Sequence, residues 1–271
     1  TVTLTSFDED LADTTDIVIP ESVSQNESGQ WIDGNSYKVT DILSATLSSN
    51  GVFYNSGITN IEFPSTLETI GNFAFRSCSG LTEVVLSNCT SLTSIGNRVF
   101  AGCSGLTSIT LPSSLTSIGY SALAQCSRLT EVDLSNCASL TSIGNLAFEG
   151  CSGLTHIDLS KCTNLTSIGT YAFQDCSGLT SIILPSSLTN IGESAFYYCI
   201  GLNTLEYKGT LEQWLSIDFG LSWMGGPSHT FIVNGEELTN LVVPEGITTI
   251  PAYAFYGCSG LTNITLPSSL N

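Results

Sequence analysis

Acidic side chains recur at matching positions of two successive repeats in the middle of the chain. Glu131 and Asp133 stand in one repeat, and His156 and Asp158 stand 25 residues later in the next. All four occupy variable positions of a Leu-x-x-Leu-x-Leu pattern, whose side chains point outward when the pattern forms a strand. Stacked strands would place Glu131 over His156 and Asp133 over Asp158, about 4.8 Å apart at the backbone. These four residues are the candidate binding site.

Two carboxylates at that separation repel each other, so the pair Asp133 and Asp158 favours a cation between them. That cation is either calcium, held by carboxylate oxygens, or a Lys or Arg side chain of a partner protein. The alternative is a solvated acidic patch without a ligand. We predict no dedicated metal site, because no metal-ligand motif is present.

Catalytic chemistry has little support in the sequence. The chain has two histidines, His156 and His229, and it lacks a G-x-S-x-G elbow, a phosphate-binding loop and any cofactor motif. We therefore predict a protein that is not an enzyme and that has neither catalytic residues nor a cofactor.

Aromatic residues form a second candidate binding surface. Tyr207, Trp214 and Trp223 lie in the only long interval between repeats, and aromatic side chains often anchor protein partners. The alternative is that they pack this segment onto the rest of the molecule. The segment is predicted to contain a short helix, from the capping box Thr210-Leu-Glu-Gln213, and a hairpin at Asn234-Gly235.

The ten cysteines occupy two equivalent positions of the repeat, without any Cys-x-x-Cys pair. Stacked side chains that point the same way do not cross-link easily. We therefore expect buried free thiols that act as small hydrophobic residues.

The elements that position these residues come from a repeated unit, I-G-x-x-A-F-x-x-C-S-G-L-T-x-I-x-L. Its aromatic position recurs with steps of 25, 23, 25, 25, 23 and 59 residues, at Phe75, Phe100, Leu123, Phe148, Phe173, Phe196 and Phe255. Such a period is typical of a solenoid, in which each unit buries its apolar face against the next. We predict an α/β solenoid: a right-handed leucine-rich repeat array with a parallel strand ladder and short helical turns on the convex side, mostly β and coil.

Four regions are expected. Residues 1–57 form an N-terminal cap with a hairpin at Asp33-Gly34 and a degenerate first repeat, and residues 58–202 form repeats of 23–25 residues. Residues 203–237 are an insertion, and residues 238–271 are a further repeat. The chain begins at Thr1 rather than Met and stops in mid-unit at Asn271, so we expect a segment of a longer parent protein.

Charge excludes two classes of partner. The 24 acidic and six basic side chains give a net charge of −18, so nucleic acid and anionic membrane surfaces are unsuitable partners. No apolar run reaches the roughly 18 to 20 residues of a membrane span. We expect a monomer.

The repeated unit and its continuation L-P-S-S-L-T-S resemble the BspA-like, Treponema-type leucine-rich repeat over roughly residues 58–202 and 238–271. Tyr207-Lys-Gly-Thr210-x-x-x-Trp214 also resembles an element found between such repeats. The resemblance implies a secreted or surface-attached protein, usually of a host-associated bacterium, that binds or adheres to a host or neighbouring-cell protein. An extracellular or cell-surface location follows from it. The alternative function is a structural spacer within a larger surface protein.

Overall fold

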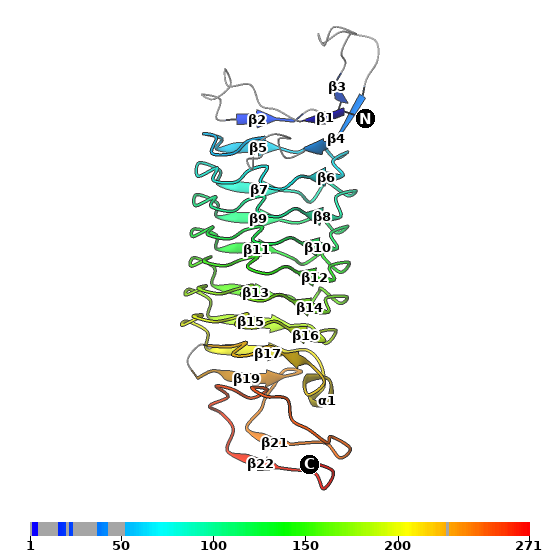
Figure 1. Cartoon of the computed structure of the whole chain (residues 1–271), viewed down its shortest axis with the longest axis vertical. Helices are drawn as coiled ribbons and strands as arrows, with labels where there is room; N and C mark the ends of the chain where they lie inside the picture. The colour runs from blue at the N-terminus through cyan, green and yellow to red at the C-terminus, as the bar shows by residue number, and fades with distance from the viewer. Residues whose placement is uncertain (1, 5–15, 20–21, 24–36, 43–51, 226–227) are drawn as a thin grey trace.

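The computed structural model describes residues 2–4, 16–19, 22–23, 37–42, 52–225 and 228–271. Figure 1 shows coils stacked along one axis, each following the last in chain order. Almost every coil contributes one strand to a ladder on one side and a shorter strand to a sheet on the opposite side. The fold is a solenoid of parallel β-strands.

The ladder strands form where the Leu-x-x-Leu-x-Leu pattern buries alternate side chains. In most of them a buried residue alternates with more exposed neighbours, as for Val84 between Glu83 and Val85. We call their outward side the ladder face. The strands are β5 (Asn60–Glu62), β7 (Glu83–Val85), β9 (Ser108–Thr110), β11 (Glu131–Asp133), β13 (His156–Asp158), β15 (Ser181–Leu184), β17 (Thr204–Tyr207), β19 (Thr230–Val233), β21 (Asn240–Val242) and β22 (Asn263–Thr265).

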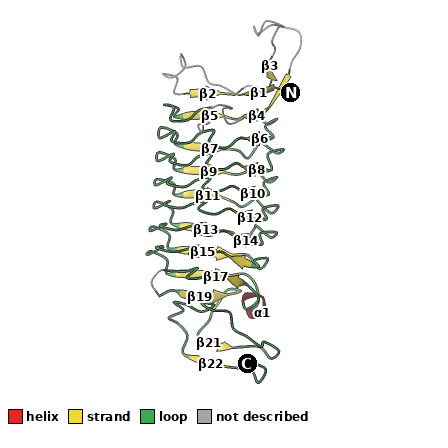
Figure 2. Ribbon diagram, viewed as in Figure 1, coloured by secondary structure: helices red, strands yellow, loops and turns green. Residues whose placement is uncertain are grey.

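The side of the solenoid opposite the ladder face is a sheet, so the predicted helical turns of the fold class are wrong. Helical turns were expected there, but two-residue strands, mostly Ser-Ile, pair in parallel from coil to coil. Because each strand bonds to the next coil, this side is a second ladder, and the only helix among the described residues is α1 (Leu211–Trp214) (Figure 2). The strands are β6 (Thr69–Ile70), β8 (Ser94–Ile95), β10 (Ser117–Ile118), β12 (Ser142–Ile143), β14 (Ser167–Ile168), β16 (Asn190–Ile191) and β18 (Asp218–Phe219).

The N-terminal region adds four strands at one end of the stack. β1 (Val2–Leu4) and β4 (Tyr37–Ile42) extend the second sheet, and β2 (Asp16–Val18) pairs in parallel with β5. β3 (Ser22–Val23) is antiparallel to β4. The predicted hairpin turn at Asp33-Gly34 lies outside the described residues.

The core between the two sheets is a column of aromatic rings. Phe148, Phe173 and Phe196 are fully buried and stack with centroids 5.0 and 5.1 Å apart. These separations match the distance between adjacent parallel strands. The predicted register of the repeat is therefore confirmed.

Coils approach each other so closely that some positions accept only glycine. A Cβ on Gly119 would lie 2.7 Å from the carbonyl oxygen of Ile95 in the preceding coil, and one on Gly144 would lie 2.8 Å from that of Ile118. The glycine column thus reflects close contact between backbones.

Residues 203–237, expected as an insertion, run in register with the solenoid. β17, β18 and β19 pair with their neighbours in the two sheets, and Met224 bridges to Phe196, where a phenylalanine stands in other coils. The predicted capping box of α1 is confirmed, with both Thr210 and Gln213 bonds present. The predicted hairpin is also confirmed, since β19 is antiparallel to β20 (Glu236–Glu237).

Candidate functional site

The four predicted ladder-face residues come together around one cleft. Glu131 and Asp133 lie on β11, and His156 and Asp158 lie on β13. All four line a hollow of about 290 Å³ on the ladder face. The sequence therefore located the residues that meet at this place.

The expected stacking of Asp133 over Asp158 is nevertheless wrong, because the ladder is interrupted here. β11 pairs with β9, β13 pairs with β15, and no pairing joins β11 to β13. The second sheet continues without a break, since β12 pairs with β14. The two coils are therefore joined on one side and separated on the ladder face.

A threonine stands just before most ladder strands, at Thr82, Thr107, Thr130, Thr155 and Thr180. The hydrogen bonds between these threonines show what the interruption removes. The N–H groups of Thr107, Thr130 and Thr180 donate to the carbonyls of Thr82, Thr107 and Thr155 at 2.8–2.9 Å, and the hydroxyl groups donate to the same carbonyls. Among the described residues, Thr155 makes neither bond to Thr130. The backbone N–H of Thr155 and the carbonyl of Thr130 therefore make no bond across the opening.

The leucine that follows each strand gives the same result. The N–H of Leu111 donates to the backbone carbonyl of Asp133, and the N–H of Leu159 donates to the backbone carbonyl of Ile183. No equivalent bond from Leu134 to Asp158 occurs in the part of the chain that the structure describes. Both ends of this strand pair are therefore open.

The opening exposes the core beneath it. Val132, the middle residue of β11, is only half-buried, whereas the equivalent Val84, Ile109, Ile157 and Ile182 have exposed fractions of 0–1%. Val132 forms part of the cleft lining. The cleft thus combines an apolar floor with carboxylates at its rim.

Like charge gives a physical reason for the opening. The bonded pairs place Asp133 beside Thr110 and Asp158 beside Ile183, so each carboxylate faces a neutral residue. Closing β11 onto β13 would place the two aspartates directly opposite each other, which destabilises a strand pair. β5 and β7 are also not paired, but Thr82 there still donates to Thr59 at 3.4 Å.

Each aspartate is instead bonded within its own coil. Asp133 Oδ1 accepts from the backbone N–H of Ser135 at 3.0 Å, and Asp158 Oδ1 accepts from that of Ser160 at 2.8 Å. Hydrogen bonding from the Ser135 hydroxyl, and to a smaller extent from its backbone N–H, lowers the pKa of Asp133, because it favours the ionised form. Asp133 is therefore ionised at neutral pH.

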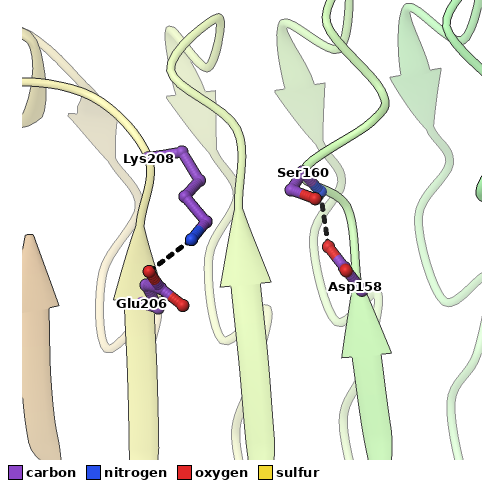
Figure 3. Close-up of polar contacts among 4 residues, drawn as sticks. All are labelled: Asp158, Ser160, Glu206 and Lys208. Atoms are coloured by element: carbon purple, nitrogen blue, oxygen red, sulfur yellow. Dashed lines mark hydrogen bonds and ion pairs between the residues drawn. The ribbon is translucent and has the colours of Figure 1, made fainter. Parts of the chain in front are cut away.

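Unlike the next carboxylate on the ladder face, the cleft carboxylates form no ion pair with any described residue. Glu206 on β17 forms an ion pair with Lys208, which is the only salt bridge among the described residues (Figure 3). Lys161, which the sequence analysis missed, lines the cleft but forms no ion pair with its carboxylates. His156 Nδ1 lies 2.6 Å from the hydroxyl of Ser181.

The metal alternative gains no support from the geometry. In the described part of the chain, no group of three or more His, Cys, Asp or Glu side chains is arranged to hold a metal ion.

The three aromatic residues predicted to form a second binding surface are buried in the core. Tyr207, Trp214 and Trp223 have exposed fractions of 0, 0 and 1%. The indole N–H of Trp214 donates to the carbonyl of Ala254 at 2.9 Å, and that of Trp223 donates to Tyr253 at 3.0 Å. These residues hold the final repeat against the stack, so they cannot also contact a partner.

The cysteines lie where the repeat predicts. Nine are buried, Cys258 is half-buried, and all ten are free thiols. One column also bonds between coils: Cys126 Sγ donates to the carbonyl of Phe100 at 3.2 Å and Cys176 Sγ to that of Phe148 at 3.2 Å. The thiols thus satisfy carbonyl groups inside the core.

No helix in the described residues is both long enough and apolar enough to cross a membrane.

Comparison with known proteins identifies the repeat type. Residues 46–164, 93–219 and 228–271 match a family model described as BspA type leucine rich repeat region, in six copies. No curated protein matches the chain. Most of the chain is therefore covered by one described kind of repeat.

Solved structures of bacterial leucine-rich repeat proteins are similar to the chain. A leucine-rich repeat protein of T. pallidum has a TM-score of 0.51 and 25% identity, over 77% of this chain and 74% of that one. A leucine-rich cell surface protein of Faecalibacterium prausnitzii has a TM-score of 0.45 and 23% identity, over 94% and 82%. A leucine-rich repeat protein of Bacteroides ovatus has a TM-score of 0.36 and 23% identity, over 96% and 82%.

Proposed function

Because this chain belongs to the BspA-type leucine-rich repeat family, we propose that it is a non-enzymatic, extracellular or cell-surface binding module that engages a host or neighbouring-cell protein through its ladder face. The contact lies at the cleft between β11 and β13. The partner presents an extended segment with a Lys or Arg side chain, and the module binds it as a monomer.

The observation that carries this proposal is the interrupted ladder at Asp133 and Asp158. Strand edges with unpaired N–H and C=O groups bind extended peptides by main-chain hydrogen bonds. Thr155 and Leu134 supply free donors, and Thr130 supplies a free acceptor. These groups can bond a partner's backbone from the mouth of the opening, since β11 and β13 stay too close together to admit a strand between them.

The acidic lining of the cleft favours a cationic side chain in the partner's segment. Glu131, Asp133 and Asp158 line the cleft without a salt bridge, and Lys161 is the only cation among them. A cationic side chain inserted there would relieve the repulsion between the aspartates and cover Val132. Electrostatic complementarity of this kind provides specificity.

A defined peptide pair tests the proposal. A short extended peptide containing lysine should bind the protein, and the same peptide with acetylated lysine should not. Asp133→Asn with Asp158→Asn should weaken binding by about tenfold or more, as expected for hydrogen-bonded charge pairs. The matched control is Glu62→Gln with Glu83→Gln, which removes two exposed carboxylates from adjacent ladder strands outside the cleft.

The spacer alternative makes the opposite prediction. A structural spacer would bind neither peptide, and the cleft and control variants would behave alike. Equal binding of the two peptides would also overturn the cleft as the site.

A further inference from the structure

Two arginines line one hollow and contact the same aromatic ring, and neither has an acidic partner among the described residues. Arg76 and Arg98 come from successive coils and are half-buried. Within the described residues, neither side chain makes a hydrogen bond or an ion pair. This is unexpected in a chain with 24 acidic and six basic side chains. None of these acidic side chains pairs with Arg76 or Arg98 among the described residues, so the two guanidinium groups can bind an anion from outside the chain.

Aromatic rings hold both guanidinium groups in place. The guanidinium carbons of Arg76 and Arg98 lie 6.0 and 5.8 Å from the centroid of the same Phe73 ring. Arg76 also lies 5.5 Å from the Tyr54 ring, and Arg98 lies 5.1 Å from the Tyr120 ring. Contact with ring faces stabilises a cation without using its N–H donors. The two groups are thus positioned, and their donors remain free.

Both arginines line a hollow of about 310 Å³ that is separate from the ladder-face cleft. The small buried residues Ala101 and Ala124 are part of its lining. Ser77 and Ser121 contribute hydroxyl groups to the lining. The hollow can therefore accept a compact ligand.

The opposite end of the hollow carries one acid. Gln125 Nε2 donates to Glu149 Oε1 at 2.8 Å, which fixes that carboxylate. Two arginines and one glutamate leave a single net positive charge in the site. A ligand with one negative group would balance it.

We propose that this hollow binds an acidic sugar residue, whose carboxylate is held by Arg76 and Arg98. The planar fork of a guanidinium matches a carboxylate with two parallel hydrogen bonds. Ser77, Ser121, Gln125 and Glu149 supply donors and acceptors suited to sugar hydroxyls. A second site of this kind goes beyond protein binding at the ladder face and does not depend on it.

Titration of the whole protein with glucuronate tests the inference. Glucuronate should bind, and neutral methyl glucoside should not. Arg76→Gln and Arg98→Gln should each weaken binding by about tenfold or more, because each removes charge-assisted hydrogen bonds to the carboxylate. Arg128→Gln is the matched control, since Arg128 is exposed and lies outside the hollow.

A second variant avoids disturbing the arginines. Gln125→Glu adds a negative charge to the lining at an exposed position and should also weaken glucuronate binding. Asp133→Asn with Asp158→Asn should leave it unchanged, which separates this site from the ladder-face cleft. Unaltered thermal unfolding of each variant verifies that folding is intact.

Three results would overturn the inference. The first is an absence of glucuronate binding, and the second is binding that survives Arg76→Gln and Arg98→Gln. The third is equal affinity for inorganic phosphate or a glutamate-containing peptide, because the site would then recognise a simple anion or an acidic peptide instead of a sugar acid.

Discussion

Asp133 and Asp158 line one cleft from neighbouring coils, yet each carboxylate accepts its hydrogen bond from the backbone of its own coil. In a regular ladder the two strands would be bonded to each other and the aspartates would be neighbours. Repulsion between like charges favours the open arrangement. The ladder thereby acquires free backbone groups between these two coils.

Amide hydrogen exchange should detect the open strand pair. The N–H of Thr155 has no acceptor in Thr130, whereas Thr130 and Thr180 both donate to the preceding threonine. We expect Thr155 to exchange about five- to tenfold faster than Thr130 or Thr180, the ratio that corresponds to one net hydrogen bond of about 1 kcal/mol. Exchange can be followed by NMR on the intact protein.

Removing both charges should close the ladder. The variant Asp133→Thr with Asp158→Thr should slow exchange at Thr155 to the level of its neighbours. The paired variant Glu62→Gln with Glu83→Gln should not. Equal protection of Thr130, Thr155 and Thr180 in the unmodified protein would contradict the interruption.

The carboxyl of Asp133 should titrate at unusually low pH. Hydrogen bonding from Ser135 lowers the pKa of Asp133, so NMR should place its midpoint below the ordinary value of about 3.9. A lowered pKa contributes stability above the unfolded-state pKa, and that contribution disappears as the pH falls through the folded-state pKa. Any stability difference between the protein and Asp133→Asn should therefore be present at neutral pH and absent below the measured midpoint.

The variant Ser135→Ala tests whether hydrogen bonding from Ser135 lowers the pKa of Asp133. Loss of the hydroxyl should raise the midpoint of Asp133 toward the ordinary value, while Ser160→Ala in the next coil should leave it unchanged. A midpoint at or above the ordinary value in the unmodified protein would refute the assignment.

Much of the fold follows from local sequence. The stacked Phe148, Phe173 and Phe196 and the cysteine columns follow from the period alone, since each unit must bury the same face. The α1 capping box was also predictable, because Thr210 and Gln213 interact over three residues.

Features that depend on contacts between coils could not be read from the repeat. A two-residue strand such as Ser94–Ile95 is too short to give a pattern, so the repeat did not predict the second sheet that it forms with the next coil. The interruption lies between two strands that each pair normally on the other side, so neither repeat alone predicts it. Burial of Trp214 depends on the final repeat that covers it.

The buried thiols should resist alkylation in the folded protein. Burial raises the pKa of Cys126 to about 12, so at pH 8 roughly one thiol in ten thousand is ionised. Iodoacetamide should modify Cys126 on the order of a thousandfold more slowly than a free cysteine. Mass spectrometry after timed quenching measures the rate.

Unfolding provides the comparison. In urea all ten cysteines should react, and in the folded protein Cys258 should react first because its side chain is half-buried. Rapid labelling of Cys126 without denaturant, or a cysteine that resists labelling in urea without reductant, would contradict a core of free thiols.

Trp214 should act as a structural link to the final repeat. Its ring packs 4.8–5.8 Å from those of Tyr207, Phe219, Trp223 and Phe231, and its N–H bonds to Ala254. Trp214→Ala should reduce the free energy of unfolding by about 3–5 kcal/mol. Urea unfolding measures the loss, and limited proteolysis should release residues 238–271 first.

The matched control for Trp214 is Leu221→Ala in the same segment, where the side chain is 65% exposed and its loss should change stability by less than about 0.5 kcal/mol. Trp214→Phe keeps an aromatic ring but leaves the Ala254 carbonyl without its donor, so it should cost about 1–3 kcal/mol. A binding anchor would behave differently, because Trp214→Ala would then abolish peptide binding while leaving unfolding unchanged. That outcome would require the ring to leave the core when a partner binds.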